Sequence, residues 1–123
     1  MEEDVIEKII RISGRNVNRC FQCGMCTAVC PMAEYMDVKP HQIIRMIQLG
    51  DKRVVEVESV WLCASCMACV DRCPRDVGPG IVFEAVRLIR LRKGLDKLDY
   101  KAVEEIEAAP TLALVTASRK YTG

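Results

Sequence analysis

The sequence predicts an all-α fold built around two copies of one cysteine-rich loop. The window "CFQCGMCTAVCP" at residues 20–31 returns as "CASCMACVDRCP" at residues 63–74, and the two windows share only four cysteines and a proline. Apolar residues recur at helical spacing before, between and after the windows. The alternating segment "VVEVESV" at residues 54–60 would have no strand to pair with. We therefore expect an irregular or helical approach to the second window.

Two helices are predicted up to the second window. The first covers about residues 5–13, and Gly14 follows it as a stop. The second begins at Pro40, a favourable first helical position, and ends before Gly50. Each has an apolar face, formed in the first by Val5, Ile6, Ile9, Ile10 and Ile12 and in the second by Ile43, Ile44, Met46 and Ile47.

Two further helices are predicted after the second window. One begins near Pro79 and ends before Gly94, with cations in its last turn that complement the helix dipole. A short one runs from Asp99 to about Ile106 and is ended by Pro110. We expect one domain over residues 1–110 and a tail over residues 111–123 that either docks a partner or is disordered.

Charge and hydropathy exclude several classes of protein. The net charge is +1, from 18 Lys and Arg against 17 Asp and Glu, whereas a nucleic-acid binder usually has a pronounced basic surplus. No apolar run approaches the roughly 20 residues that span a bilayer. The acidic start "MEEDVIEK" does not have the order of a secretory signal. We expect a cytoplasmic protein with no nucleic-acid partner and no direct membrane insertion.

The eight cysteines favour metal ligation over disulfides. They lie two or three residues apart in two tight runs, and such short loops gain little from cross-linking. Disulfide frameworks also belong mainly to secreted domains. The eight thiols are therefore expected to be ligands.

The spacing within each run points to iron–sulfur clusters. The pattern C-x2-C-x2-C-x3-C-P is the bacterial run in which three cysteines bind one cluster and the fourth binds the other. The proline after the fourth cysteine favours an extended backbone there and turns that thiol away from its own run. Two [4Fe–4S] clusters with crossed ligation are therefore expected. The first set is Cys20, Cys23 and Cys26 (the first triad) with Cys73, and the second set is Cys63, Cys66 and Cys69 (the second triad) with Cys30.

Two zinc sites are the competing form of ligation, but zinc motifs generally use two CxxC pairs separated by a longer loop. Two fully ligated clusters leave no iron open to a substrate, and no obvious catalytic set exists elsewhere. The residues by themselves therefore indicate an electron relay without a catalytic site of its own.

Other residues near the runs receive structural roles. His41, the only histidine, is expected to cap its helix or face solvent. Trp61 is expected to shield a cluster. The expected core filler around the clusters is Met25, Met32, Met36, Met46 and Met67. A solvated edge of mixed charge is expected from Asp71, Arg72, Arg75 and Asp76.

A full helix between the runs resembles the α-helical ferredoxin domain of succinate dehydrogenase and fumarate reductase iron–sulfur subunits. The segments "NVNRCFQCGMCTAVCP", "KPHQIIRMIQLG" and "VWLCASCMACVDRCPRDV" are similar to the C subunit of heterodisulfide reductase, and the similarity extends over about residues 6–93. In that family the eight corresponding cysteines carry two [4Fe–4S] clusters.

The resemblance implies a component of an oxidoreductase complex in methanogenesis-type energy metabolism. The C subunit of that family passes electrons from the A subunit, which carries flavin and iron–sulfur clusters, to the catalytic B subunit, which cleaves the heterodisulfide of coenzyme M and coenzyme B. A hydrogenase or formate dehydrogenase can join the larger assembly. Two alternatives stay open: an equivalent subunit of a fumarate reductase-like or glycerol-3-phosphate dehydrogenase-like complex, and a zinc-stabilised interaction module without redox activity.

Overall fold

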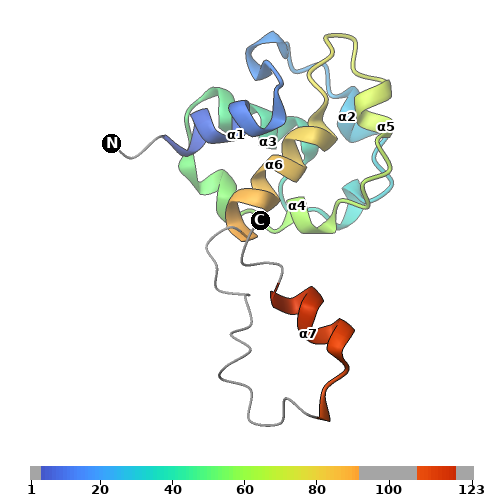
Figure 1. Ribbon diagram of the computed structural model, residues 1–123. Coiled ribbons are helices and arrows are strands. Elements are labelled where there is room, and N and C mark those ends of the chain that lie inside the picture. The colour runs from blue at the N-terminus through green and yellow to red at the C-terminus, as the bar shows by residue number, and fades with distance from the viewer. Residues whose placement is uncertain (1–3, 92–107, 119–123) are drawn as a thin grey trace. The chain divides into compact units, whose positions relative to one another are not determined.

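The computed structural model describes residues 4–91 and 108–118 (Figure 1). All regular structure in these ranges is helical, which confirms the predicted all-α fold. The chain divides into two compact units, Met1–Ile89 and Arg90–Gly123, while the domain boundary predicted after residue 110 stays a prediction. No helix among the described residues has the length and apolar character to cross a membrane.

The described residues form short α-helices linked by 3-10 turns, labelled η. In chain order they are α1 (Val5–Ser13), η1 (Val17–Arg19), α2 (Met25–Ala28), η2 (Ala33–Tyr35), α3 (Pro40–Gln48), η3 (Lys52–Glu56), α4 (Ser59–Leu62), α5 (Ala68–Asp71), α6 (Pro79–Leu91) and α7 (Thr111–Ser118).

The start and stop signals in the sequence place the longer helices correctly. Gly14 ends α1 in the left-handed conformation, with φ of 63°, and its N–H donates to the carbonyl of Ile10 at 2.9 Å. Pro40 is the first residue of α3, and the N–H of Lys39 just before it donates to the Gln42 side chain at 2.8 Å. Pro79 likewise begins α6. The expected stop at Gly94 lies outside the described residues.

The approach to the second run is helical, as expected. η3 and α4 are separated by an extended Val57, with φ of −63° and ψ of 124°. Ser59, at the start of α4, is fully buried and accepts the N–H of Val38 at 3.1 Å. Its hydroxyl also donates to the carboxylate of Asp37. These bonds hold α4, which leads directly into the second triad, against the segment before α3.

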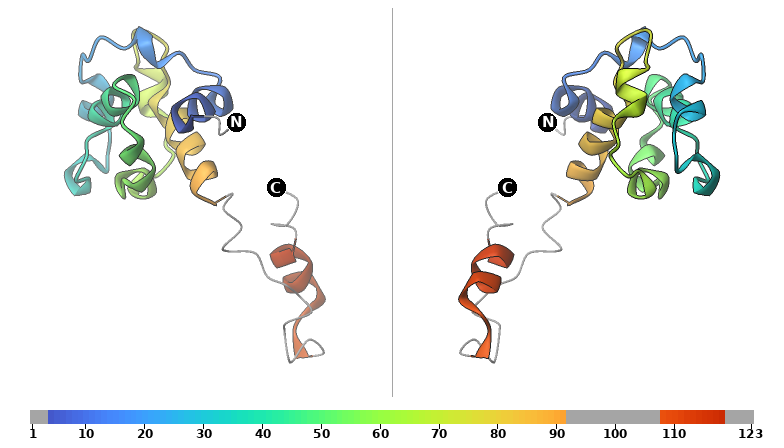
Figure 2. Two further views of the ribbon diagram at one scale, coloured as in Figure 1. Left: turned by 90° about the vertical axis from the view of Figure 1, so that its left-hand side faces the viewer. Right: turned by 90° about the vertical axis from the view of Figure 1, so that its right-hand side faces the viewer.

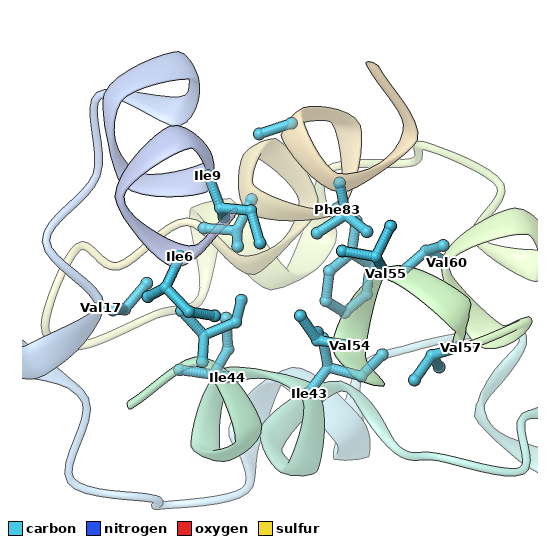
Figure 3. Packing of buried hydrophobic residues seen from close by; sticks show 14 of the residues in the cluster. Ile6, Ile9, Val17, Ile43, Ile44, Val54, Val55, Val57, Val60 and Phe83 are labelled. Atoms are coloured by element: carbon cyan, nitrogen blue, oxygen red, sulfur yellow. The ribbon is translucent and has the colours of Figure 1, made fainter. Parts of the chain in front are cut away.

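The apolar faces of α1, α3 and α6 meet in one core (Figure 3). Ile9, Ile43 and Phe83 come from the three helices, and each is at most 1% exposed. Burying such a side chain contributes about 1.5–3 kcal/mol. Cys20, Cys63 and Cys73 pack against this core, together with Val5, Ile10, Ile12, Val38, Met46 and Ile89. The core therefore supports both cysteine runs from behind.

The helix α7 is a difference from the prediction, which found no strong pattern after residue 110. The carbonyl of Pro110 accepts the N–H groups of Ala113 at 2.9 Å and Leu114 at 3.2 Å, so this proline precedes a helix. The apolar residues of "TLALVTAS" do not gather on one face, which is why periodicity missed the helix. The helix expected from Asp99 to Ile106 lies outside the described residues.

Candidate metal centre

The two cysteine runs have the same backbone conformation as well as the same cysteine spacing. The helices α2 and α5 begin and end at positions that differ by 43 residues, the same offset as the runs. Gln22 and its counterpart Ser65 are both left-handed, with φ of 62° and 54°. Gly24 and its counterpart Met67 are also left-handed, with φ of 79° and 61°. Left-handed backbone costs a non-glycine residue about 1–2 kcal/mol, and such strain concentrates at functional sites.

The two runs lie side by side because α2 packs against α5 (Figure 1). Burial and, after it, the nearby Cys69 thiol in α5 raise the pKa of the Cys26 thiol in α2 from 9.0 to about 11. Cys20 and Cys23 add smaller contributions in the same direction. The third cysteines of the two triads therefore lie close together where the two short helices pack.

The other three thiols of the predicted second set lie near Cys69. Burial raises the pKa of this thiol, and the N–H of Gly80 opposes that effect. The thiols of Cys63, Cys66 and Cys30 each raise it as well. Cys30 thus comes from the first run to the second triad, which supports one half of the crossed ligation.

Contacts around Cys73 support the other half. The segment that follows Cys73 lies beside the residues that flank Cys20, at the same end of the unit in both views of Figure 2. The contacts between them are the Arg75 Nε–H donated to the Arg19 carbonyl (3.3 Å), the Arg75 guanidinium over the Phe21 ring (6.0 Å) and the Arg15–Asp76 ion pair (3.1 Å). They join the segment that follows Cys73 to the residues around Cys20, as crossed ligation requires.

Hydrogen-bond donors point at the sulfurs of the first set. The backbone N–H and the side-chain Nε2–H of Gln22 both donate to Cys20 Sγ, each at 3.4 Å. The N–H of Val77 donates to Cys73 Sγ at 3.4 Å. Burial alone would raise the pKa of Cys73, but the backbone N–H groups of Val77, Arg75, Gly78 and Asp76 lower it below the ordinary value. Such donors stabilise a thiolate, the form that binds metal.

The start of α6 approaches the second triad so closely that a side chain at position 80 would crowd it. A Cβ on Gly80 would lie 3.2 Å from Met67 Sδ and 3.4 Å from Cys69 Sγ. The helix therefore presents its first N–H groups, where its dipole is positive, to a buried thiol.

The donor set fits iron–sulfur clusters. All eight cysteines are free thiols, and burial raises the pKa of Cys26 and of Cys69, so these two favour the neutral form until cations replace their protons. In the described part of the chain no three Cys, His, Asp or Glu side chains converge as they do around a single metal ion. A [4Fe–4S] cluster binds its four cysteines at separate irons and needs no such convergence.

The structure places the remaining predicted residues as follows. His41 is half-buried: its backbone N–H donates to Thr27 Oγ1 at 3.3 Å, and its Nδ1 lies 2.7 Å from the same oxygen. Trp61 is 39% exposed, and the Arg87 guanidinium lies over its ring. It can therefore shield a cluster only in part. Met36 is buried at 3%, but the prediction of core filler is wrong for Met25, which is 45% exposed. All four charged residues of the predicted edge are exposed.

Two residues near the site were missed by sequence reasoning. Gln22 gave no signal, because an amide inside a CxxC has no pattern of its own. Arg87 stands out because it interrupts the apolar run "IVFEAVRLIRL", but that pattern gave it no role at the site. Its guanidinium donates to the carbonyls of Val60 at 2.6 Å and Cys63 at 2.5 Å and to Ser65 Oγ at 3.1 Å. It thereby fixes the start of the second loop to α6.

Comparison with known proteins agrees with this site. A family model described as a 4Fe-4S dicluster domain matches residues 16–77. Together with the eight cysteines, it confirms two [4Fe–4S] clusters as the cofactors.

The curated relatives carry names of one kind. The C subunit of the ferredoxin:CoB-CoM heterodisulfide reductase of Methanosarcina acetivorans is 38% identical over 68% of this chain and 35% of its own length. The C subunit of the H(2):CoB-CoM heterodisulfide,ferredoxin reductase of Methanothermobacter thermautotrophicus is 34% identical over 73% and 48%. The second iron-sulfur C subunit of the CoB--CoM heterodisulfide reductase of Methanocaldococcus jannaschii is 32% identical over 65% and 43%. The predicted resemblance is confirmed, although the chain spans less than half the length of these three relatives.

Proposed function

Because the chain belongs to the 4Fe-4S dicluster domain family, whose model covers residues 16–77 of its 123, we propose that it is the electron-transferring C subunit of a heterodisulfide reductase complex. The observation that carries this proposal is the pair of cysteine loops with one backbone shape, packed against each other on one core. The names of the relatives support the type of complex.

The eight cysteines would hold the clusters in two crossed sets. The first triad with Cys73 binds one, and the second triad with Cys30 binds the other. When bound, the clusters supply reversible one-electron transfer. The chain's own residues hold the thiols in place, donate hydrogen bonds to sulfur and cover the inner side of the site with the apolar core.

The electron path would run from the flavin-bearing A subunit to the catalytic B subunit, where the heterodisulfide of coenzyme M and coenzyme B is cleaved. This chain then has no catalytic site of its own and works in the cytoplasm as part of the larger complex. The relative of Methanococcus maripaludis is named as the C2 subunit of an H(2)/formate:CoB-CoM heterodisulfide,ferredoxin reductase, so a hydrogenase or formate dehydrogenase is a reasonable further partner.

Anaerobic purification tests the cofactor part of the proposal. About eight irons and eight sulfides per chain are expected for two cubanes. Two zinc ions without sulfide would contradict it and favour an interaction module.

Reconstitution with the A and B subunits tests the functional part. Reduction of the heterodisulfide should require this chain and should be lost when Cys23 is changed to Ser, while the three subunits still assemble. Co-purification with a fumarate reductase-like assembly instead would contradict the proposed complex.

A further inference from the structure

The two loops share one backbone but differ in what donates to their sulfurs. Gln22 and Ser65 occupy the same left-handed position, two residues after the first cysteine of each run. The Gln22 amide donates to Cys20 Sγ at 3.4 Å. The Ser65 hydroxyl instead accepts from Arg87 Nη1 at 3.1 Å. The first triad therefore has a side-chain donor to sulfur, whereas the equivalent side chain in the second triad accepts a hydrogen bond from Arg87.

The backbone donors increase the same asymmetry. In the first set, Cys20 receives the Gln22 N–H and Cys73 receives the Val77 N–H, each at 3.4 Å. In the second set, the N–H of Gly80 acts on Cys69. Among the described residues, the N–H groups within hydrogen-bonding distance and angle of a sulfur all donate to Cys20 or Cys73.

Nearby arginines do not reverse this difference. Arg75 stacks over Phe21 at 6.0 Å beside the first triad, and Arg87 stacks over Trp61 at 5.9 Å beside the second. Each loop thus has one guanidinium at almost the same distance from an aromatic ring. The hydrogen bonds to sulfur are the difference between the two sites on which the inference rests, and the first N–H groups of α6 near Cys69 act in the opposite direction.

Donors to sulfur stabilise the reduced cluster more than the oxidised one, because reduction adds negative charge that spreads onto the thiolates. We propose that the cluster of the first triad has the higher reduction potential of the two, that the Gln22 amide sets part of the difference, and that electrons leave the chain at the first triad. This inference rests on the proposed electron relay and on crossed ligation.

The surface at the first triad suits an electron exit. Phe21 is 60% exposed and Met25 is 45% exposed, and both lie within the first run. Cys23 between them is itself exposed. An acceptor that covers these side chains would approach the first cluster closely.

Exchanging the two matched residues tests the inference. Gln22→Ser puts at position 22 the residue that already occupies the equivalent left-handed position, so the backbone is expected to tolerate it. Ser65→Gln supplies an amide to the second triad, while Arg87 keeps its bonds to two carbonyls. The readout is an EPR-monitored redox titration of the cluster-loaded chain, which gives two midpoint potentials.

The expected results have opposite directions. Gln22→Ser should lower the higher of the two midpoint potentials by about 30 mV. At a fixed potential this is about a threefold fall in the ratio of reduced to oxidised cluster, since about 59 mV corresponds to a factor of ten. Ser65→Gln should raise the lower midpoint by a similar amount. If Gln22→Ser moves the lower midpoint, or moves neither, the inference is overturned. A wild-type chain without iron signals would instead reject the proposed function itself.

Discussion

A methyl group added at Gly80 offers a sharp test of how α6 supports the second triad. The new Cβ would lie 3.2 Å from Met67 Sδ, 3.3 Å from Val70 Cγ2 and 3.4 Å from Cys69 Sγ. Ordinary van der Waals contacts between such atoms are longer, so at least one neighbour must move. Met67 Sδ is near the end of a flexible side chain and can turn aside. Cys69 Sγ cannot do so once it is bonded to iron.

The net cost to stability of Gly80→Ala is expected to be small. Overpacking a well-packed site costs about 1–3 kcal/mol. Alanine in place of glycine in a helix returns about 1 kcal/mol. The difference, about 0–2 kcal/mol, leaves the chain folded. The damage should therefore appear in cluster content rather than in the fold.

Gly14→Ala is the matched control. Gly14 is left-handed with φ of 63°, and nothing lies within 4 Å of its Cβ position, so alanine costs about 1–2 kcal/mol in backbone strain without touching a thiol. Iron and sulfide per folded chain should fall toward about half in Gly80→Ala, because two cubanes hold about eight irons. Both should be unchanged in Gly14→Ala. Full cluster content in Gly80→Ala, or equal losses in the two variants, would refute the reasoning.

Three further predictions concern the thiols and their support. Cys73→Ser should change the EPR signal of the cluster bound by Cys20 and leave that of the cluster bound by Cys63; a change confined to the latter would disprove crossed ligation. Arg87→Lys replaces a fork that donates to two carbonyls with a single ammonium, and should lower the unfolding free energy of the loaded chain in urea by about 1–3 kcal/mol; an unchanged midpoint would contradict the role of the fork. Burial raises the pKa of Cys26 from 9.0 to about 11, so this thiol stabilises the folded metal-free chain fully below pH 9 and loses that contribution as pH rises to 11. Helix content measured by circular dichroism under reductant should fall over that interval in the wild type and fall less in Cys26→Ser.

The helices that could be predicted are those with local signals. Pro40 and Pro79 start helices, and Gly14 ends one, because the preferences of these residues for φ act within a single turn. α7 escaped prediction because its apolar residues surround the helix. Met25 was misplaced for a related reason: its residue type indicates burial, but its position in a short helix of the loop leaves it in solvent.

The cysteine spacing by itself determined the two triads, since three thiols separated by two residues remain close in any compact turn. Tertiary packing decided what surrounds them. The approach of Cys30 to Cys69, and of the segment after Cys73 to the segment before Cys20, depends on α2 lying against α5. The side-chain donors differ between the loops partly for the same reason: the Gln22 amide reaches Cys20 within its own loop, whereas the equivalent serine accepts from an arginine that the fold brings from α6.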